Sequence, residues 1–384
     1  MRARKSVGLS QERLAEVLRV DRSTVTRWEC AETEPQPWLR PKLARALGLR
    51  LHQLDEMLSV IEGIEEPADD GRLSSVLTGR TRVDLAAIHQ LQDQVRQLGE
   101  AYETMPSASL LARAGQTHAV LTLLLAEAYD DRGVQALHTA LAASASLMSQ
   151  LIWDASGRRD GASTLDYCDQ AIVAANETGD AVMAAHAELR KCYVALYGLH
   201  GARNPSLGQA LAESAATIGK STSHALTGLA LLHVAEALAM QGEYRQTEQA
   251  LSQAEHHFSH TMADDVGAEF FSPSQFGRLS GSCYLFLNSP ERAQVILEET
   301  AALLPDRPKT RSLVLGNLAL SFIRQRQIDA ATGTLMDAID LIEDTRGGAG
   351  MSVVFSAGRE LYPWRAEPAV QEINDRLLAL MAKN

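Results

Sequence analysis

The segment DRSTVTR, residues 21–27, gathers hydrogen-bond donors on a short stretch of chain. At helical spacing, Val25 and Trp28 share one side, and four donors fall on the other: Arg22, Ser23, Thr26 and Arg27. A guanidinium group can bind the two acceptor atoms on the edge of guanine as a fork, and a hydroxyl can bind any base or a phosphate. The pattern therefore indicates a contact with nucleic acid. The alternative is a polar face that is merely solvated. Trp28, on the apolar side, is expected to be a core residue.

Other patterns that could carry chemistry are weaker. His256 and His260 in HHFSH have the i, i+4 spacing of helical metal ligands, but no carboxylate or cysteine accompanies them, which favours the end of a polar helix. The four cysteines form no CxxC pair and indicate reduced thiols. No GxxxxGK[ST] loop or nucleophile elbow occurs, and RGGAG at 346–350 is typical of a connector. The sequence predicts no enzyme, no metal site and no cofactor.

Composition and charge favour a helical protein with two unlike parts. Apolar residues make up 46% and aromatic residues only 5%, while alanine and leucine are abundant in long tracts. The net charge of −12 argues against a protein that coats nucleic acid nonspecifically. Residues 1–60 hold 11 Lys and Arg against 8 Asp and Glu, a net +3, so the remaining chain carries −15. A small basic head is thus joined to a large acidic body.

No targeting or membrane segment is evident. The longest apolar runs fall short of the roughly 20 residues that span a bilayer. The beginning MRARKSVGLS lacks the apolar core of a signal peptide. We therefore expect a cytoplasmic protein with no membrane partner.

The donor face must be positioned by the helices around it. Ser10 is a favoured N-cap for an apolar helical stripe that includes Leu14 and Leu18, and RVD makes a turn before the donor segment. After a proline-marked loop, WLRPKLARALGL and LHQLDEML carry leucines at helical spacing. The pattern predicts four clear helices after a short first one within residues 1–60.

Three segments of the head, GLSQERLAEVL, DRSTVTRWE and LARALGLRLHQLDEML, together resemble the phage-repressor (XRE) type of helix-turn-helix domain over most of residues 8–58. The resemblance implies that the second helix crosses the DNA backbone with Gln11 near a phosphate, and that the third helix enters the major groove. On that mapping the residues that contact bases are Arg22, Ser23, Thr26 and Arg27. The family usually has glycine in the turn before DRS, where this chain has Arg19, which implies a less comfortable backbone or a phosphate contact.

The body predicts a helical solenoid. Residues 61–79 are typical of an acidic linker, and residues 80–384 alternate apolar helical runs with short polar turns, the brief MSVVF at 351–355 being the one hint of a strand. Three segments repeat the same offsets, with small residues at Ala235, Gly281 and Ala319 and turn positions at Gly242, Asn288 and Arg326. They resemble degenerate tetratricopeptide (TPR) repeats, which implies that neighbouring helix pairs stack into a solenoid.

The whole chain is therefore expected to be all-α: a five-helix helix-turn-helix domain at 1–60, a linker at 61–79, and a TPR-like repeat domain at 80–384. This plan resembles bacterial transcription regulators, including peptide-responsive quorum-sensing receptors. On TPR-like geometry the first helices of the repeats would offer these side chains to the concave surface: Glu236, Gln275, Arg278, Ser282, Phe286, Asn317 and Arg324. Ordinary solenoid surface is the alternative interpretation of that set.

Two functions follow from this plan. In the first, the chain binds operator DNA as a homodimer, and its body binds a peptide or small signal molecule that modulates DNA binding. In the second, the body is a protein–protein interaction scaffold with no small ligand, and the head tethers it to DNA.

Overall fold

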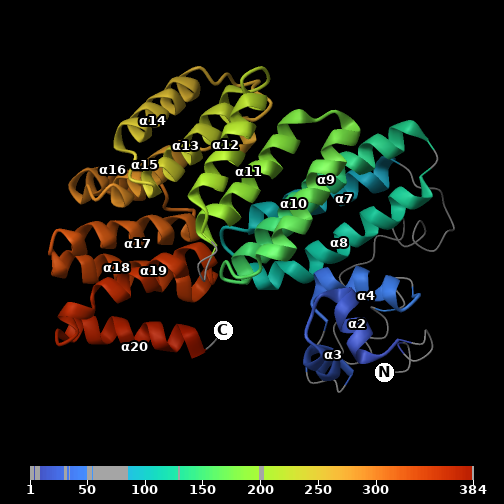
Figure 1. Ribbon diagram of the computed structural model, residues 1–384, viewed down its shortest axis with the longest axis horizontal. Helices are drawn as coiled ribbons and strands as arrows, with labels where there is room; N and C mark the ends of the chain where they lie inside the picture. Colours follow the sequence, from blue (N-terminus) through green and yellow to red (C-terminus); the bar gives the residue numbers. More distant parts are fainter. Residues whose placement is uncertain are drawn as a thin grey trace. The chain divides into compact units, whose positions relative to one another are not determined.

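A computed structural model describes residues 4, 9–29, 33, 35–49, 54, 85–128, 130–198 and 203–382 (Figure 1). Every regular element in these ranges is helical, so the all-α prediction is confirmed. The contacts within the chain separate it into two compact units: residues 1–95 with 111–140 (unit 1), and residues 96–110 with 141–384 (unit 2). The linker predicted at 61–79 and nearly all of the fifth helix of the head lie outside the described residues.

The head is built from short helices around a small core. These are α2 (Gln11–Leu18), α3 (Arg22–Glu29), the 3-10 turn η1 (Pro37–Leu39) and α4 (Arg40–Ala46). Ser10 caps α2 as predicted, because its Oγ accepts a hydrogen bond from the amide of Arg13 at 3.0 Å. The buried core includes Leu14, Leu18, Val25, Leu43 and Leu47, and the partly buried Trp28 packs against it.

The turn between α2 and α3 requires a left-handed backbone conformation at a residue that is not glycine. Arg19 follows α2 with φ 56° and ψ 46°, a left-handed conformation in which glycine is favoured. The side chain of Arg19 is exposed, and the turn is held by backbone hydrogen bonds from the amide of Arg19 to the carbonyl of Glu16 at 3.2 Å and from the amide of Val20 to the carbonyl of Ala15 at 3.0 Å. The departure noted in the sequence is therefore a point of real backbone strain.

A long run of helices follows the head (Figure 1). They are α7 (Leu85–Ala101), α8 (Ser107–Glu127), α9 (Asp131–Ala155), α10 (Gly161–Thr178), α11 (Ala181–Tyr197), α12 (Pro205–Gly219), α13 (His224–Met240), α14 (Tyr244–Ser259), α15 (Pro273–Phe286), α16 (Pro290–Ala302), α17 (Pro308–Arg324), α18 (Ile328–Thr345), α19 (Gly348–Glu360) and α20 (Pro368–Ala382), with 3-10 turns η2 (Ala268–Phe270) and η3 (Tyr362–Trp364). None of the helices among the described residues is long and apolar enough to cross a membrane.

From α10 to α18 each helix packs against the next, and α11, α13, α15, α17 and α19 also contact one another in succession. These five helices therefore form one continuous layer of unit 2, and the helices between them form the second. This is the two-layer arrangement of a helical solenoid, in which each helix pair buries its apolar side against its neighbours.

The three predicted repeats share one backbone conformation at their turns. Gly242, Asn288 and Arg326 all have positive φ, at 80°, 53° and 59°, and the next helix begins two residues later in each case. The expectation of a strand at MSVVF is wrong, because residues 351–355 lie inside α19. Val354 there is fully buried, and α19 packs along α17, so tertiary packing overrides the β-propensity of the valines.

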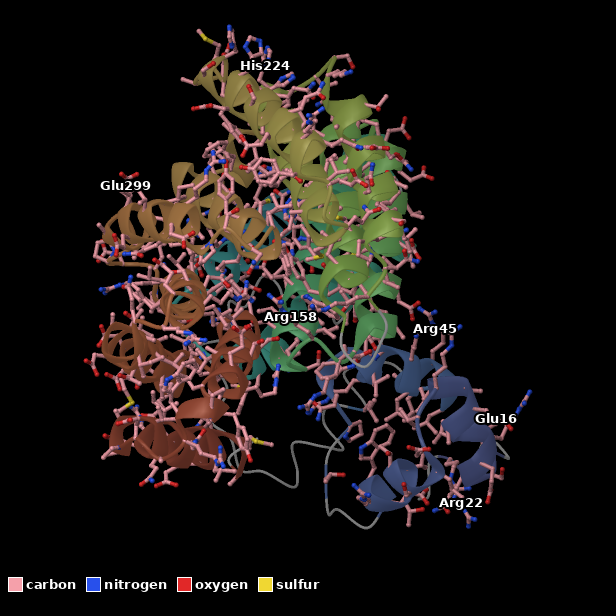
Figure 2. All side chains as sticks on the ribbon, turned by 60° about the vertical axis from the view of Figure 1, so that its left-hand side comes forward. Glu16, Arg22, Arg45, Arg158, His224 and Glu299 are labelled. Atoms are coloured by element: carbon pink, nitrogen blue, oxygen red, sulfur yellow. The ribbon has the colours of Figure 1, made fainter. Side chains whose placement is uncertain are left out.

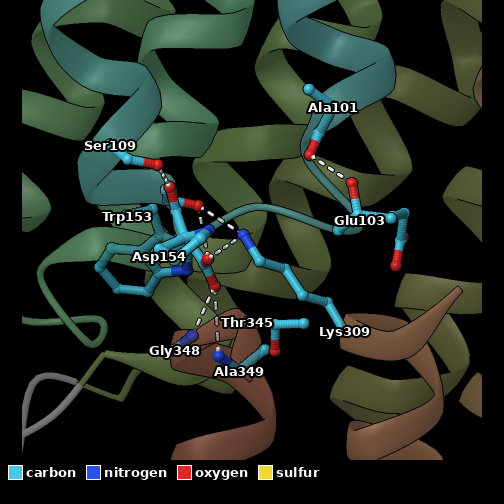
Figure 3. Close-up of polar contacts among 12 residues, drawn as sticks. Ala101, Glu103, Ser109, Trp153, Asp154, Lys309, Thr345, Gly348 and Ala349 are labelled. Atoms are coloured by element: carbon cyan, nitrogen blue, oxygen red, sulfur yellow. Dashed lines mark hydrogen bonds and ion pairs between the residues drawn. The ribbon is translucent and has the colours of Figure 1, made fainter. Parts of the chain in front are cut away.

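Segments of unit 2 that are distant in sequence meet at Asp154, near the end of α9 (Figure 3). Its carboxylate accepts hydrogen bonds from Ser107 Oγ at 2.7 Å, from Lys309 Nζ at 3.1 Å and from the amide of Gly348 at 2.7 Å. The side chains of Asp154 and Lys309 are each only 4% exposed. RGGAG connects two helices as predicted, through Arg346 and Gly347 between α18 and α19; in addition α19 begins inside it, and the first amides of that helix bind this carboxylate.

Candidate nucleic-acid interface

The four donors predicted to contact DNA are all exposed on α3: Arg22, Ser23, Thr26 and Arg27. Val25, on the other side of the helix, is only 1% exposed. Figure 2 shows Arg22 at the outer surface of the head. The helix thus buries one narrow apolar edge and presents guanidinium and hydroxyl groups to solvent, in the arrangement that major-groove contact requires.

Local contacts orient the donors without occupying them. The Nε of Arg22 lies 2.9 Å from Glu12 Oε1, but both side chains are more than half exposed, so the ion pair is weak and easily exchanged for a phosphate or base. The hydroxyl of Thr26 donates to the carbonyl of Arg22, one turn earlier, at 3.1 Å.

Gln11 connects the two helices of the motif. Its Nε2 donates to Glu29 Oε2 at 2.7 Å, and its Oε1 lies 3.4 Å from the Thr26 hydroxyl, whose one hydrogen it shares with the nearer carbonyl of Arg22. The side chain is partly buried at the start of α2. It is therefore held between α2 and α3, and its predicted phosphate contact stays a prediction.

Glu29 is the centre of a buried polar link that the sequence analysis missed. The guanidinium of Arg4 donates two hydrogen bonds to its carboxylate, both at 3.0 Å, and a third to the carbonyl of Leu9 at 2.6 Å. The side chains of Arg4 and Glu29 are only 10% and 8% exposed. The hydrogen bonds from Arg4, with that from Gln11, outweigh burial and lower the pKa of Glu29 to about 2.

The link joins the segment before α2, the start of α2 and the end of α3. A forked, hydrogen-bonded ion pair of this kind fixes the angle at which α3 is presented. Its members lie 25 residues apart and have no periodic pattern, so only the opposite charges of Arg4 and Glu29 could have signalled it.

Three of the candidate effector residues come together in unit 2. Ser282 Oγ donates to Glu236 Oε1 at 2.9 Å, and the hydroxyl of Tyr197 donates to the other oxygen of the same carboxylate. Glu236 is 1% exposed; burial acts to raise its pKa, but the contact with His233, the hydroxyl of Tyr197 and the charge of Arg278 together lower it. Glu236, Arg278 and Ser282 therefore belong to one polar cluster between α13 and α15.

The other candidates occupy different surroundings. Gln275 completes a capping box at the start of α15, where its Oε1 accepts from the amide of Ser272 at 2.7 Å. Arg324 forms a forked ion pair with Glu360, at 3.2 and 2.9 Å. Phe286 ends α15 with 41% of its surface exposed, and Asn317 is 8% exposed in α17.

The comparisons with known proteins bear on the head. A family model described as Helix-turn-helix (HTH_3) matches residues 1–54, the segment that contains Gln11 and the donor face of α3. No curated protein matches the chain. Residues 1–54 thus match a helix-turn-helix domain of the XRE type, which supports a DNA-binding regulator, and the described residues that follow are helical.

Proposed function

We propose that this chain is a sequence-specific transcription regulator that binds operator DNA as a homodimer and whose TPR-like body binds an effector that modulates DNA binding. The observation that carries the first part is the exposed donor face of α3, presented at an angle fixed by the Arg4–Glu29–Gln11 link. One such helix covers only a few base pairs, which favours a dimer on two half-sites about one helical turn apart.

In this mechanism the third helix lies in the major groove. Arg22 and Arg27 contact base edges, Ser23 and Thr26 contact bases or phosphates, and Gln11 contacts the backbone. Because Gln11 and Thr26 are already joined through a hydrogen bond, the phosphate contact and the base contacts are positioned together.

The experiment is a mobility-shift titration with an operator selected from random duplex DNA. Arg22→Ala and Arg27→Ala should each cost about 1–3 kcal/mol in operator binding without loss of fold. Gln11→Ala should weaken binding to all sequences similarly. The matched control is Arg13→Ala, which removes an arginine whose side chain is 68% exposed on α2 and paired with Glu16. Wild-type affinity in both arginine variants of α3 would refute the assignment.

The effector part is supported by the polar cluster around Glu236 and by the size of the body, since residues 61–384 are far more than a dimerisation handle needs. A ligand shifts DNA binding only if it binds one conformation better than another, and a tenfold preference amounts to about 1.4 kcal/mol. Substitutions at Arg278 and Asn317 should abolish the response to effector while leaving DNA binding without effector unchanged. Native mass spectrometry of protein purified from its own host tests whether a ligand is carried.

A further inference from the structure

A group of basic and aromatic side chains lines one face of α11 and meets the layer beside it. His186, Arg190, Tyr193 and Tyr197 follow one another at spacings of four, three and four residues, so they share a single side of the helix. The ring of Tyr193 lies 4.6 Å from that of His233 on α13. The guanidinium carbon of Arg158 lies 4.7 Å from the centre of the Tyr197 ring.

Three arginines surround this tyrosine pair, and we call Arg158, Arg190 and Arg278 the arginine cluster. The charges of Arg190 and Arg278 both act on Tyr193, and those of Arg158 and Arg278 both act on Tyr197. Figure 2 shows Arg158 among the helices of unit 2, whereas His224 and Glu299 lie at its edge. The three guanidinium groups therefore occupy one neighbourhood.

The positive charge of the arginine cluster is only partly balanced by the described part of the chain: the charges of Asp154 and Glu236 act on Arg158, and Arg190 donates a hydrogen bond to the neutral amide of Gln150 at 2.7 Å. None of the three forms an ion pair with a described carboxylate. The oxygens of Glu236 are engaged by Tyr197 and Ser282, and Asp154 is engaged by Lys309 and the start of α19. Residues 61–384 carry a net −15, so three neighbouring arginines without a close ion pair to a described carboxylate are unexpected from the body's composition.

Several buried polar atoms in this neighbourhood have no partner. The Nε atoms of Arg158 and Arg190 are buried without a hydrogen bond. His233 is 2% exposed; its Nε2 has no hydrogen-bond partner, and its Nδ1 lies 3.4 Å from a carboxylate oxygen of Glu236. Leaving a buried polar atom without a hydrogen bond is costly, and more so when the group is charged. A bound group rich in acceptors would remove that cost.

The cluster is deep but still reachable from solvent. Burial raises the pKa of Tyr193 to about 12 and lowers the pKa of Arg158. Even so, the arginines of the cluster and both tyrosines keep an intermediate exposure instead of being sealed in the core. Side chains that are largely buried but keep some exposed surface can be contacted by a small ligand.

We propose that unit 2 binds a small organic anion, whose carboxylate or phosphate oxygens are held by the arginine cluster and whose remainder lies against Tyr193 and Tyr197. A planar guanidinium binds such oxygens through paired hydrogen bonds, which lysine cannot do. The inference rests on the proposed effector function and names the chemical class of the effector. A free organic acid, a phosphorylated small molecule and the carboxy-terminus of a peptide share this chemistry.

Thermal unfolding of the full-length protein tests the site directly. The probes are sodium phosphate, sodium citrate, and tetra-alanine with a free or an amidated carboxy-terminus, each compared with sodium chloride at equal ionic strength. At least one anionic probe should produce a saturable rise in Tm, on the order of a few degrees, because it binds the folded state alone. Arg190→Gln and Arg278→Gln should lose that rise, and Arg245→Gln, at an exposed arginine of α14, should keep it.

The change in Tm that Arg278→Gln causes in sodium chloride alone distinguishes a ligand-binding role of this arginine from a structural role. Arg278→Gln should change Tm in chloride only slightly, because Arg278 forms no close ion pair with a described carboxylate and acts on Glu236 only through its charge; a marked loss of stability there would overturn the proposal. Equal probe-induced shifts in all variants, or no shift in the wild type, would overturn it as well. A response to phosphate and citrate alone identifies a free anion, and a response to the free but not the amidated peptide identifies a peptide terminus.

A mobility-shift assay with the same probes distinguishes this site from the proposed regulation. If the wild type shows the variant-sensitive rise in Tm but its operator binding is unchanged by the probe, the anion site stands and the effector part of the proposed function fails.

Discussion

At the scale of single residues, the head depends on a link that is stronger than an ordinary surface ion pair. The carboxylate of Glu29 receives two hydrogen bonds from Arg4 and one from Gln11, so its charge is well compensated although it is largely buried. Removing one partner of such a pair leaves the other buried and unpaired, which is costly. The link therefore matters to both the stability of the head and the angle of α3.

We expect Glu29→Gln to destabilise the head by on the order of 3 kcal/mol at pH 7 and to weaken operator binding. The folded pKa of Glu29, about 2, lies below its ordinary value of 4.5, so the stabilisation is fully present above about pH 4.5. It is lost as the pH falls from there towards 2. Chemical denaturation of both proteins at pH 7 and pH 3 should show their difference shrinking with acid. Glu16→Gln, in an exposed pair, should show neither effect.

For single residues, the sequence predicted only those features that depend on neighbouring positions in the chain. The donor face of α3 and the core position of Trp28 follow from spacings of three and four residues, which one helix expresses by itself. Arg19 was visible as a departure from a family glycine, and its φ of 56° gives the physical reason. Arg4 and Glu29 meet only after the head has folded, so no short window contained them.

At the scale of elements, the repeats depend on small residues where helices cross. A Cβ atom placed on Gly281 of α15 would lie 2.5 Å from Leu297 Cδ2 of α16, and Leu297 is fully buried. The sequence identified these crossings because the same offsets recur within each segment, although the segments lie 46 and 38 residues apart. MSVVF misled because five residues cannot distinguish a buried strand from the buried side of a helix.

Gly281→Ala should therefore lower the free energy of unfolding by about 1–3 kcal/mol through overpacking. Gly333→Ala is the matched control, since it lies within α18 with no atom within 4 Å of the added methyl group. That substitution should stabilise the protein by up to about 1 kcal/mol through helix propensity. Urea unfolding followed by circular dichroism measures both. Equal effects of the two substitutions would contradict the close crossing of α15 and α16.

At the scale of the whole molecule, unit 2 is tied together by contacts that no sequence pattern announces. The Lys309–Asp154 pair and the Gly348–Asp154 hydrogen bond join residues 155 and 194 positions apart. What was predictable at this scale was the division of charge, a basic head and an acidic body, because composition needs no knowledge of contacts. That division favours the attraction of DNA to the head.

The last prediction concerns which part of the chain forms the dimer. The core that contains the head's larger apolar side chains also includes Ala119 of α8, and among the described residues of the head Val17 is the only large hydrophobic one that is markedly exposed, at 49%. The described residues of the head therefore offer little apolar surface for a dimer contact, whereas specific interfaces bury about 800 Å² per partner. Truncation after residue 66 should thus give a monomer by analytical ultracentrifugation, with weak, salt-sensitive DNA binding, while the full chain is a dimer that engages two half-sites. A truncated head that is itself tightly dimeric, or a full chain that remains monomeric on its operator, would show that assembly does not reside in the body.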